Sequence, residues 1–258
     1  MASKTLSIAA TLLALATAST AAQAATTDWT GFYIGANAGQ VKGKSNVAVT
    51  PVFSPTGYFA MSSTPAIASS AAGKVSPDSF GGGVTAGYNF QKGDAVFGVE
   101  FDYNTQSASD SRTAGGTYPC CAPTAYTLSE TTKADQLMTL RGRLGLSAGN
   151  SLYYVTAGLG RTKLKVVDTF NDNFATAAES FAASKTKSAT IWGVGYEYNF
   201  QNHWSLKAEY LRADFGSISG TSTNLTAFTP PIAFPTNTFY HSADYKENIL
   251  RIGVNYRF

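Results

Sequence analysis

Apolar and polar residues alternate in eight stretches of about ten residues each, the pattern of strands with one apolar face. In the clearest stretch, Trp192, Val194 and Tyr196 alternate with Gly193 and Glu197. A strand of this length, tilted by about 40°, crosses roughly 25 Å, which matches the apolar thickness of an outer membrane. The predicted strands cover residues 30–40, 80–90, 95–104, 136–147, 152–161, 189–200, 205–214 and 248–258.

The connections between these stretches alternate in length. Three are tight, at residues 91–94, 148–151 and 201–203. The long ones cover residues 41–79, 105–135, 162–188 and 216–247. Short periplasmic turns and long outer loops are typical of outer-membrane barrels, and an even strand number puts both termini on the periplasmic side. The sequence therefore predicts an all-β fold, an eight-stranded antiparallel transmembrane β-barrel of the outer-membrane type.

Aromatic residues gather near the predicted periplasmic strand ends, where a barrel has an interfacial girdle. They are Trp29, Tyr88, Phe90, Tyr198, Phe200, Trp204, Tyr256 and Phe258. The alternative is a β-sandwich, in which the same residues would pack between two sheets. Strand lengths and loop asymmetry favour the barrel.

The chain begins with the layout of a secretory signal peptide. Lys4 precedes an uncharged apolar run over residues 6–18, and small residues end at Ala22 and Ala24. Cleavage after Ala24 predicts a signal peptide over residues 1–24 and one barrel domain over residues 25–258. A core helix is the alternative for the apolar run. No later stretch has the roughly 20 consecutive apolar residues of a membrane helix.

The charge balance limits the partners. The formal net charge is +3 for the whole chain and falls to +2 when Lys4 is removed. A nucleic-acid partner usually requires a strong basic stripe, so the sequence argues against one. Outer-membrane lipid and lipopolysaccharide are the partners that a barrel implies.

Charged residues also fall on the predicted inward faces of the strands, and we expect them to form a charge network in the lumen. The network comprises Glu100, Asp102, Arg141, Arg143, Glu197, Lys207, Glu209, Arg251 and Arg257. The third and fourth strands are neighbours, so Glu100 and Asp102 can meet Arg141 and Arg143 across the ladder. Because the side chains of an eight-stranded barrel fill its interior, a salt-bridged plug is favoured over a narrow pore with a charged selectivity filter.

Few residues suggest catalysis. His203 lies in a predicted periplasmic turn and His241 in the last outer loop, so we expect both to be solvated and too far apart to share a catalytic site. The sequence accordingly predicts no enzyme, no cofactor and no metal. Cys120 and Cys121 lie in the second outer loop. An oxidising compartment allows them to close an eight-membered ring or to pair between chains.

Several short motifs resemble one family, the outer-membrane immunogenic proteins of alphaproteobacteria, which are small porin-family or opacity-like barrels. The motifs are the segments 29–35 (WTGFYIG), 87–90 (GYNF), 195–200 (GYEYNF), 204–211 (WSLKAEYL) and 251–258 (RIGVNYRF). The resemblance implies an eight-stranded barrel, surface exposure and insertion by the barrel-assembly machinery, which reads a last strand ending in an aromatic residue such as Tyr256 or Phe258. The family's pattern does not include adjacent cysteines, and we expect no periplasmic domain after Phe258.

The expected role is that of a surface-exposed structural barrel that contributes to envelope integrity and presents its loops to host or phage surface factors. Two alternatives remain open. One is a small diffusion channel. The other is binding of haem or another ligand by the outer loops, where His241, Tyr240 and Tyr245 could serve as ligands.

Overall fold

Eight long antiparallel strands form the body of the protein. The computed structural model describes residues 27–201 and 203–258, so the predicted cleavage residues Ala22 and Ala24 lie outside it. The long strands are β1 (Gly31–Pro51), β3 (Asp78–Lys92), β4 (Ala95–Thr117), β5 (Ala125–Ala148), β6 (Ser151–Asp172), β7 (Ala178–Gln201), β8 (Trp204–Ser222) and β11 (Phe239–Arg257). The short elements are α1 (Ser63–Ala71), β2 (Gly73–Val75), β9 (Thr226–Ala227) and β10 (Ile232–Ala233).

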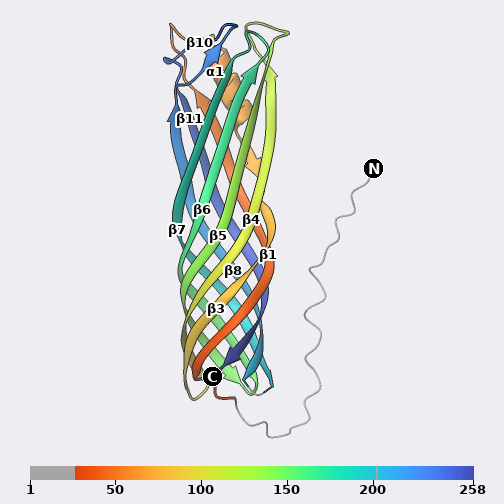
Figure 1. Cartoon of the computed structure of the whole chain (residues 1–258), viewed down its shortest axis with the longest axis vertical. Helices are drawn as coiled ribbons and strands as arrows, with labels where there is room; N and C mark the ends of the chain where they lie inside the picture. The colour runs from red at the N-terminus through yellow and green to blue at the C-terminus, as the bar shows by residue number, and fades with distance from the viewer. Residues whose placement is uncertain (1–26, 202) are drawn as a thin grey trace, which may run out of the picture.

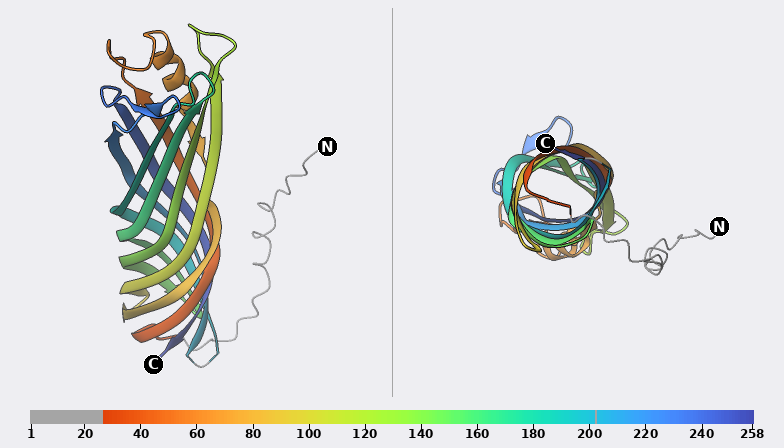
Figure 2. Two further views of the ribbon diagram at one scale, coloured as in Figure 1. Left: turned by 45° about the horizontal axis from the view of Figure 1, so that its top comes forward. Right: turned by 90° about the horizontal axis from the view of Figure 1, so that it is seen from below.

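The long strands close into a ring (Figures 1 and 2). Each pairs with the next along the chain, and β1 also pairs with β11, where Tyr33 lies opposite Arg257. Pairing of β7 with β8 completes the circle. The prediction of an eight-stranded antiparallel barrel is confirmed. No helix among the described residues is long and apolar enough to cross a membrane.

Three tight turns join strands at the end that carries Phe258, which we call the short-turn end (Figure 1). The turns follow Lys92, Ala148 and Gln201, as predicted. Gly93 and Gly149 have φ of +60°, a conformation that glycine adopts without steric cost. His203 has φ of 78° in the third turn and is exposed, as expected.

The strands are longer than predicted, so the prediction of four long loops is wrong for the second and third, which shrink to turns at residues 118–124 and 173–177. The first and last connections remain long, at residues 52–77 and 223–238. The long strands contain between 15 and 24 residues. Ala108 pairs with Ala134 and Thr117 with Ala125 within a stretch predicted as loop. Seven strands, all but β3, thus continue far beyond the predicted spans. We call this distal part the stalk, covering residues 41–51, 105–117, 125–135, 162–172, 178–188, 215–222 and 239–247.

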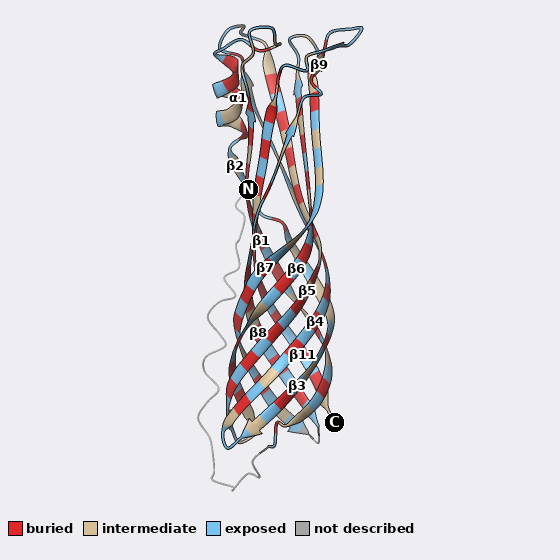
Figure 3. Ribbon diagram, turned by 90° about the vertical axis from the view of Figure 1, so that its left-hand side faces the viewer, coloured by how far each residue is buried: buried red, intermediate tan, exposed pale blue. Residues whose placement is uncertain are grey.

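The phase of the apolar pattern reverses where the stalk begins. In β6, Val155 and Leu159 point outward and are 54% and 65% exposed. Further along the same strand, Leu164 and Val166 are buried inside the barrel. An outward apolar face suits lipid, and an inward one suits a wall surrounded by water. The reversal therefore marks the edge of the lipid-facing band, and Figure 3 shows the alternating exposure along each strand.

Layers of side chains fill the interior. At the short-turn end, Trp29, Val96, Leu152 and Tyr154 form a small apolar cluster. The predicted charge network follows, and above it is an apolar layer that includes Leu137, Leu164, Ile191, Leu211 and Phe215. At the distal end, a second apolar cluster joins α1 to the strands through residues that include Phe59, Ile67, Phe170 and Phe239.

Candidate functional site

The inward charges lie at the level of the lipid-facing band, in the middle of the barrel wall. Eight of the nine predicted members have buried side chains: Glu100, Asp102, Arg141, Arg143, Glu197, Lys207, Glu209 and Arg251. They come from β4, β5, β7, β8 and β11. Most of their neighbours along each strand are apolar residues that point outward, so the alternation directs the charged side chains into the lumen. Four acids thus meet four bases in a region screened from water.

Arg141 lies at the centre of the network. Its Nη2 atom is 2.5 Å from Glu100 Oε1 and 2.6 Å from Asp102 Oδ2, and its Nη1 atom is 3.0 Å from Glu209 Oε1. Glu100 is its cross-strand partner, whereas Glu209 reaches it from β8. One guanidinium therefore links three carboxylates from two sides of the barrel.

Three other bases complete the network. Arg251 binds Glu209 at 2.5 Å and Asp102 at 3.1 Å. Lys207 lies 2.9 Å from Glu100. Arg143 was expected to pair with Glu100 or Asp102 on β4. Its nearest carboxylate is instead that of Glu197, at 2.8 Å, and the Glu100 carboxylate lies 3.6 Å away. Four positive and four negative charges balance in one connected cluster.

Arg257, the ninth predicted member, lies apart. Its guanidinium is 5.1 Å from the centre of the Trp29 ring, and among the described residues it forms no ion pair. Its position on the last strand puts it next to the short-turn end, below the carboxylates. The structure thus brings eight of the predicted residues together and leaves this one outside.

Uncharged polar residues that the sequence reasoning left out support the network. Tyr33 donates a hydrogen bond to Glu100 (2.8 Å), and Tyr154 donates one to Glu209 (3.0 Å). Thr139 donates to Asp102 at 2.7 Å, and Asn255 donates to Glu197 at 2.8 Å. All four alternate with outward apolar residues, so the period-two pattern already placed them on the inward face.

His241 contradicts the expectation of a solvated histidine. Its side chain is buried in the stalk, seven residues before the predicted membrane span of β11, which begins at residue 248. Its Nδ1 atom is 2.9 Å from Asp168 Oδ2, and its Nε2 atom is 2.9 Å from Ser222 Oγ. This order of groups resembles a Ser-His-Asp triad, which the sequence analysis did not predict.

A fourth residue changes the chemistry of this arrangement. The hydroxyl of Ser222 also donates to the Glu179 carboxylate, which lies 3.4 Å from His241 Nε2. A carboxylate beside the serine oxygen would repel the oxyanion of an acyl-transfer step. The imidazole of His241 also stacks on the ring of Phe181, with 4.3 Å between the ring centroids. The cluster is therefore better suited to holding a proton than to attacking a substrate.

The cluster lies where the barrel wall is weakest. The ladder between β7 and β8 runs from Thr190 opposite Asp214 down to the short turn and, in the described residues, goes no higher. Across the unpaired part, Ser222 of β8 contacts Glu179 of β7, and the Lys185 ammonium donates to the Ser219 carbonyl at 3.2 Å. Side chains therefore hold these two strands together in the stalk.

The protonation of His241 should make this part of the stalk pH-sensitive. Burial favours the neutral ring, but hydrogen bonds to Asp168 and Glu179 and their negative charges outweigh it, so the pKa of His241 is raised above 6.5. Burial also raises the pKa of the neighbouring Glu130. A group whose pKa is raised on folding stabilises the folded state below its unfolded pKa, and that contribution is lost as pH rises through the folded pKa.

We therefore expect amide protection in the distal halves of β6 and β11 to decrease as pH rises from about 6 toward 9. Hydrogen exchange, corrected for the intrinsic pH dependence, measures this protection. In His241→Asn the difference from the native protein should be largest below pH 6.5. A constant difference over the whole range would show that the charge of His241 has no part in stalk stability.

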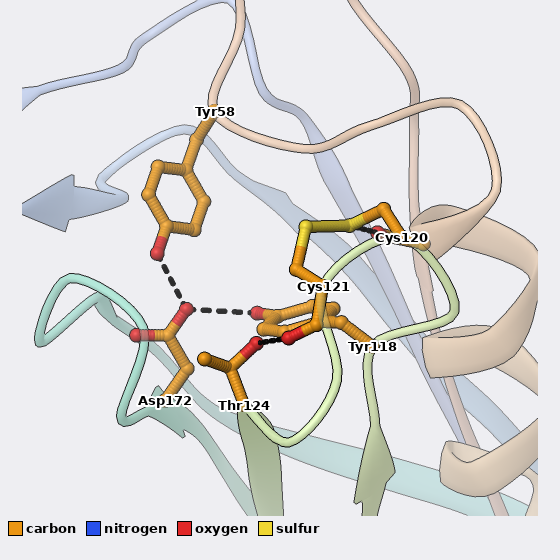
Figure 4. Close-up of a disulfide and its surroundings, with 7 residues drawn as sticks. Tyr58, Tyr118, Cys120, Cys121, Thr124 and Asp172 are labelled. Atoms are coloured by element: carbon orange, nitrogen blue, oxygen red, sulfur yellow. Dashed lines mark hydrogen bonds between the residues drawn. A yellow bond between two sulfur atoms is a disulfide. The ribbon is translucent and has the colours of Figure 1, made fainter.

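The two cysteines are bonded to each other in the turn between β4 and β5 (Figure 4). Of the two pairings left open by the sequence, the structure has the eight-membered ring. Beside it, the hydroxyls of Tyr58 and Tyr118 both donate to Asp172 Oδ2, at 2.5 and 2.8 Å. The loop before α1, the β4 end and the β6 end are thereby tied together at the tip.

The three residues considered as haem ligands do not converge. His241 and Tyr245 are buried inside the barrel, whereas Tyr240 points outward and is 54% exposed. Both ring nitrogens of His241 have partners, and the Tyr245 hydroxyl donates to Glu247 at 3.0 Å. Within the described part of the chain, no group of three or more His, Cys, Asp or Glu residues is placed to hold a metal ion.

Comparison with known proteins agrees with this architecture. Residues 10–258 match the family model of the outer membrane protein beta-barrel domain. The chain belongs to this family. It is 32% identical over 243 residues to the 31 kDa outer-membrane immunogenic protein of Brucella melitensis, covering 93% of this chain and 88% of that protein. The predicted family is thereby confirmed, and the protein is located in the cell outer membrane.

Two further proteins are less similar to this outer-membrane β-barrel protein than the Brucella protein is. The 22 kDa outer membrane protein of Rhizobium leguminosarum is 27% identical over 69% of this chain and 66% of its own length. Among solved structures, Ail of Yersinia pestis has a TM-score of 0.37 and 13% identity, covering 86% of this chain and 98% of Ail.

The last strand of this family member ends in exposed aromatic residues. Phe258 is 67% exposed, and its ring lies 5.2 Å from that of Tyr256, which also contacts Trp204 at 5.1 Å. These rings lie at the short-turn end, where the sequence predicted an aromatic girdle. Trp29, also predicted in the girdle, is instead buried inside the barrel with Val96 and Leu152. Tyr256 and Phe258, the predicted assembly signal, are thus adjacent on the outside of the barrel.

Proposed function

We propose that the protein is a non-conducting structural barrel that contributes to envelope integrity and holds a rigid stalk outside the cell. The observation that carries this proposal is the filled lumen. A neutral network centred on Arg141 occupies the membrane level, and the apolar layer around Leu164 and Phe215 lies above it. Ions would have to displace both layers, one charged and one apolar.

The alternative is a narrow diffusion channel with the same charges as its filter. It is less well supported, because selectivity filters need ions to enter and leave easily, whereas Arg141 already contacts three carboxylates. Ligand binding by His241 is also less well supported, since both of its ring nitrogens have partners. A hydrolytic function is disfavoured by Glu179 beside Ser222.

We also propose that the stalk is a contact surface for other molecules outside the cell. Its tip exposes large apolar side chains far from the lipid-facing band: Val52, Met61, Phe174, Phe228 and Ile232. Exposed apolar groups of this kind often mark contact surfaces. Host or phage surface factors are the proposed partners. The Brucella relative, named an immunogenic protein, is consistent with exposure at the cell surface.

Insertion by the barrel-assembly machinery is the third part of the proposal. Tyr256 and Phe258 end the closing strand with two outward aromatic rings, which fits a signal read from the last strand. Both termini would then be periplasmic and the stalk extracellular.

Planar-bilayer recording tests the non-conducting barrel. We expect the refolded protein to migrate differently on gels before and after heating, which indicates a folded barrel, and to give no steady conductance. Arg257→Gln, outside the network, should behave in the same way. Discrete conductance steps that change in Arg141→Gln or Glu100→Gln would show a pore and overturn the proposal.

A further inference from the structure

Basic side chains gather on one side of the outer wall, directly above the lipid-facing band. Arg161, Lys163 and Lys165 alternate along β6 with the inward Thr162 and Leu164, so the three bases share its outer face. In Figure 1, β5, β6 and β7 lie side by side facing the viewer. The stretch containing these bases was predicted as mostly loop, and only its folding as a strand aligns their charges.

Few acids neutralise this group. Asp135 on β5 accepts from Lys165 at 2.9 Å and from Lys133 at 3.4 Å. Arg161 and Lys163 are exposed and form no ion pair with the described residues. Their partners on β7 are Ser188 and Thr186, which carry no charge. When Lys133 is counted with the three bases and Asp135 is subtracted, the patch keeps an excess of three positive charges at the membrane surface.

An apolar groove lies below the patch on the same strands. Its volume is ≈ 570 Å³, and the outward residues that line it include Gly142, Leu144, Val155, Ala157 and Trp192. A Cβ atom added to Gly142 would have open space in front of it, with Ala157 O as its nearest neighbour at 3.8 Å. Small residues between large ones thus leave a depression in the lipid-facing wall.

The groove is continuous with a second one toward β8. The two share Leu144, Val155 and Val194, and the second has a volume of ≈ 790 Å³. Both face the bilayer interior, where lipid chains are the surrounding medium.

The vertical spacing of groove and bases matches a phosphorylated lipid. Ala157 and Arg161 are four residues apart on β6, which is roughly 13 Å along the strand and roughly 10 Å along the membrane normal. The headgroup layer of a bilayer is about 5–8 Å thick on each side. A lipid chain in the groove therefore has its phosphate near Arg161 and Lys163.

We propose that Arg161, Lys163 and the groove at Gly142 and Ala157 form a binding site for a phosphorylated glycolipid of the outer leaflet, of the lipopolysaccharide class. The site specifies the lipid partner that the sequence led us to expect, and it rests on the proposed extracellular position of the stalk. It does not depend on whether the lumen conducts. The bases bind the phosphates, and the groove binds the upper part of one acyl chain.

Native mass spectrometry of the refolded mature barrel, released from detergent, tests the site with diphosphoryl lipid A as the probe. We expect Arg161→Gln/Lys163→Gln to weaken binding by about tenfold or more. Ala157→Leu, which fills the groove and keeps the charges, should also weaken it. The matched control is Lys42→Gln/Lys44→Gln, which removes two outward bases at the same height on β1 and should bind like the native protein.

Two further probes separate the sources of binding energy. Lipid A without its phosphates should bind the native protein about as weakly as the double variant binds the diphosphoryl form, and inorganic phosphate alone should not bind in a saturable way. The proposal is overturned if both double variants lose the same affinity for lipid A, or if the native protein binds the phosphate-free lipid as well as the diphosphoryl form. It is also overturned if the protein forms a lipid-free dimer that excludes the probe. Heat-modifiable migration of every variant shows that the barrel itself has folded.

Discussion

Arg141→Met should lower the free energy of unfolding of the barrel by about 3–5 kcal/mol, the usual cost of removing one partner from a buried ion pair. Methionine keeps an unbranched apolar stem like that of arginine, so the main change is the loss of the guanidinium. Glu100, Asp102 and Glu209 would then lie in the lumen with one positive charge too few. Denaturant unfolding in detergent micelles, followed by tryptophan fluorescence, measures the change.

Arg257→Met is the matched control. It removes the same side chain from a position that has no ion pair among the described residues, so its effect should be well below that of Arg141→Met. If the two variants lose equal stability, the network does not stabilise the barrel, and its charges must be explained by another role. An increase in stability for Arg141→Met would mean that burying the charges costs more than their pairing returns.

The membrane part of the fold could be predicted because the lipid imposes a simple rule on the sequence. Outward residues such as Trp192 and Leu144 must be apolar, and inward residues such as Arg143 and Glu197 can be polar. A period of two follows directly, and the lengths of the spans come from the bilayer. The positions of the short turns could also be predicted, since few residues separate the alternating stretches.

The strands of the stalk could not be predicted from the same pattern. Once the wall leaves the lipid, its outer face becomes polar and its apolar face turns inward, as Leu164 and Val166 do. A sequence pattern sought with apolar residues outward misses such strands and reports loops. Lys163 and Lys165 then fall within a predicted loop, whereas the strand puts them on one face.

Side-chain contacts across the lumen could not be predicted from the sequence either. The pairing of Glu100 with Arg141 followed from neighbouring strands, but the reach of Glu209 and Arg251 to the same centre depends on the curvature and register of the whole ring. His241 and Ser222 come from the paired strands β11 and β8, whereas Asp168 reaches them from β6, which pairs with neither. No local signal joins them, so the histidine was wrongly expected in solvent.

The second large effect concerns the distal cluster that closes the stalk. Phe239 is fully buried, and its ring lies 5.7 Å from Phe59 and 5.8 Å from Phe170. Phe239→Ala should cost about 3–5 kcal/mol through lost burial and the cavity left behind. Because the membrane part is held by separate layers, we expect the stalk to open locally while the barrel stays folded.

Limited proteolysis of the protein in intact outer membranes distinguishes these two regions. Phe239→Ala should be cut in the stalk at protease concentrations that leave the native protein intact, yet its core fragment should still shift on heating. Phe174→Ala, which removes a 54% exposed ring at the tip, should resist cleavage like the native protein. Loss of heat-modifiable migration in Phe239→Ala would instead show that stalk and barrel unfold as one cooperative unit, and that the apolar layers couple them.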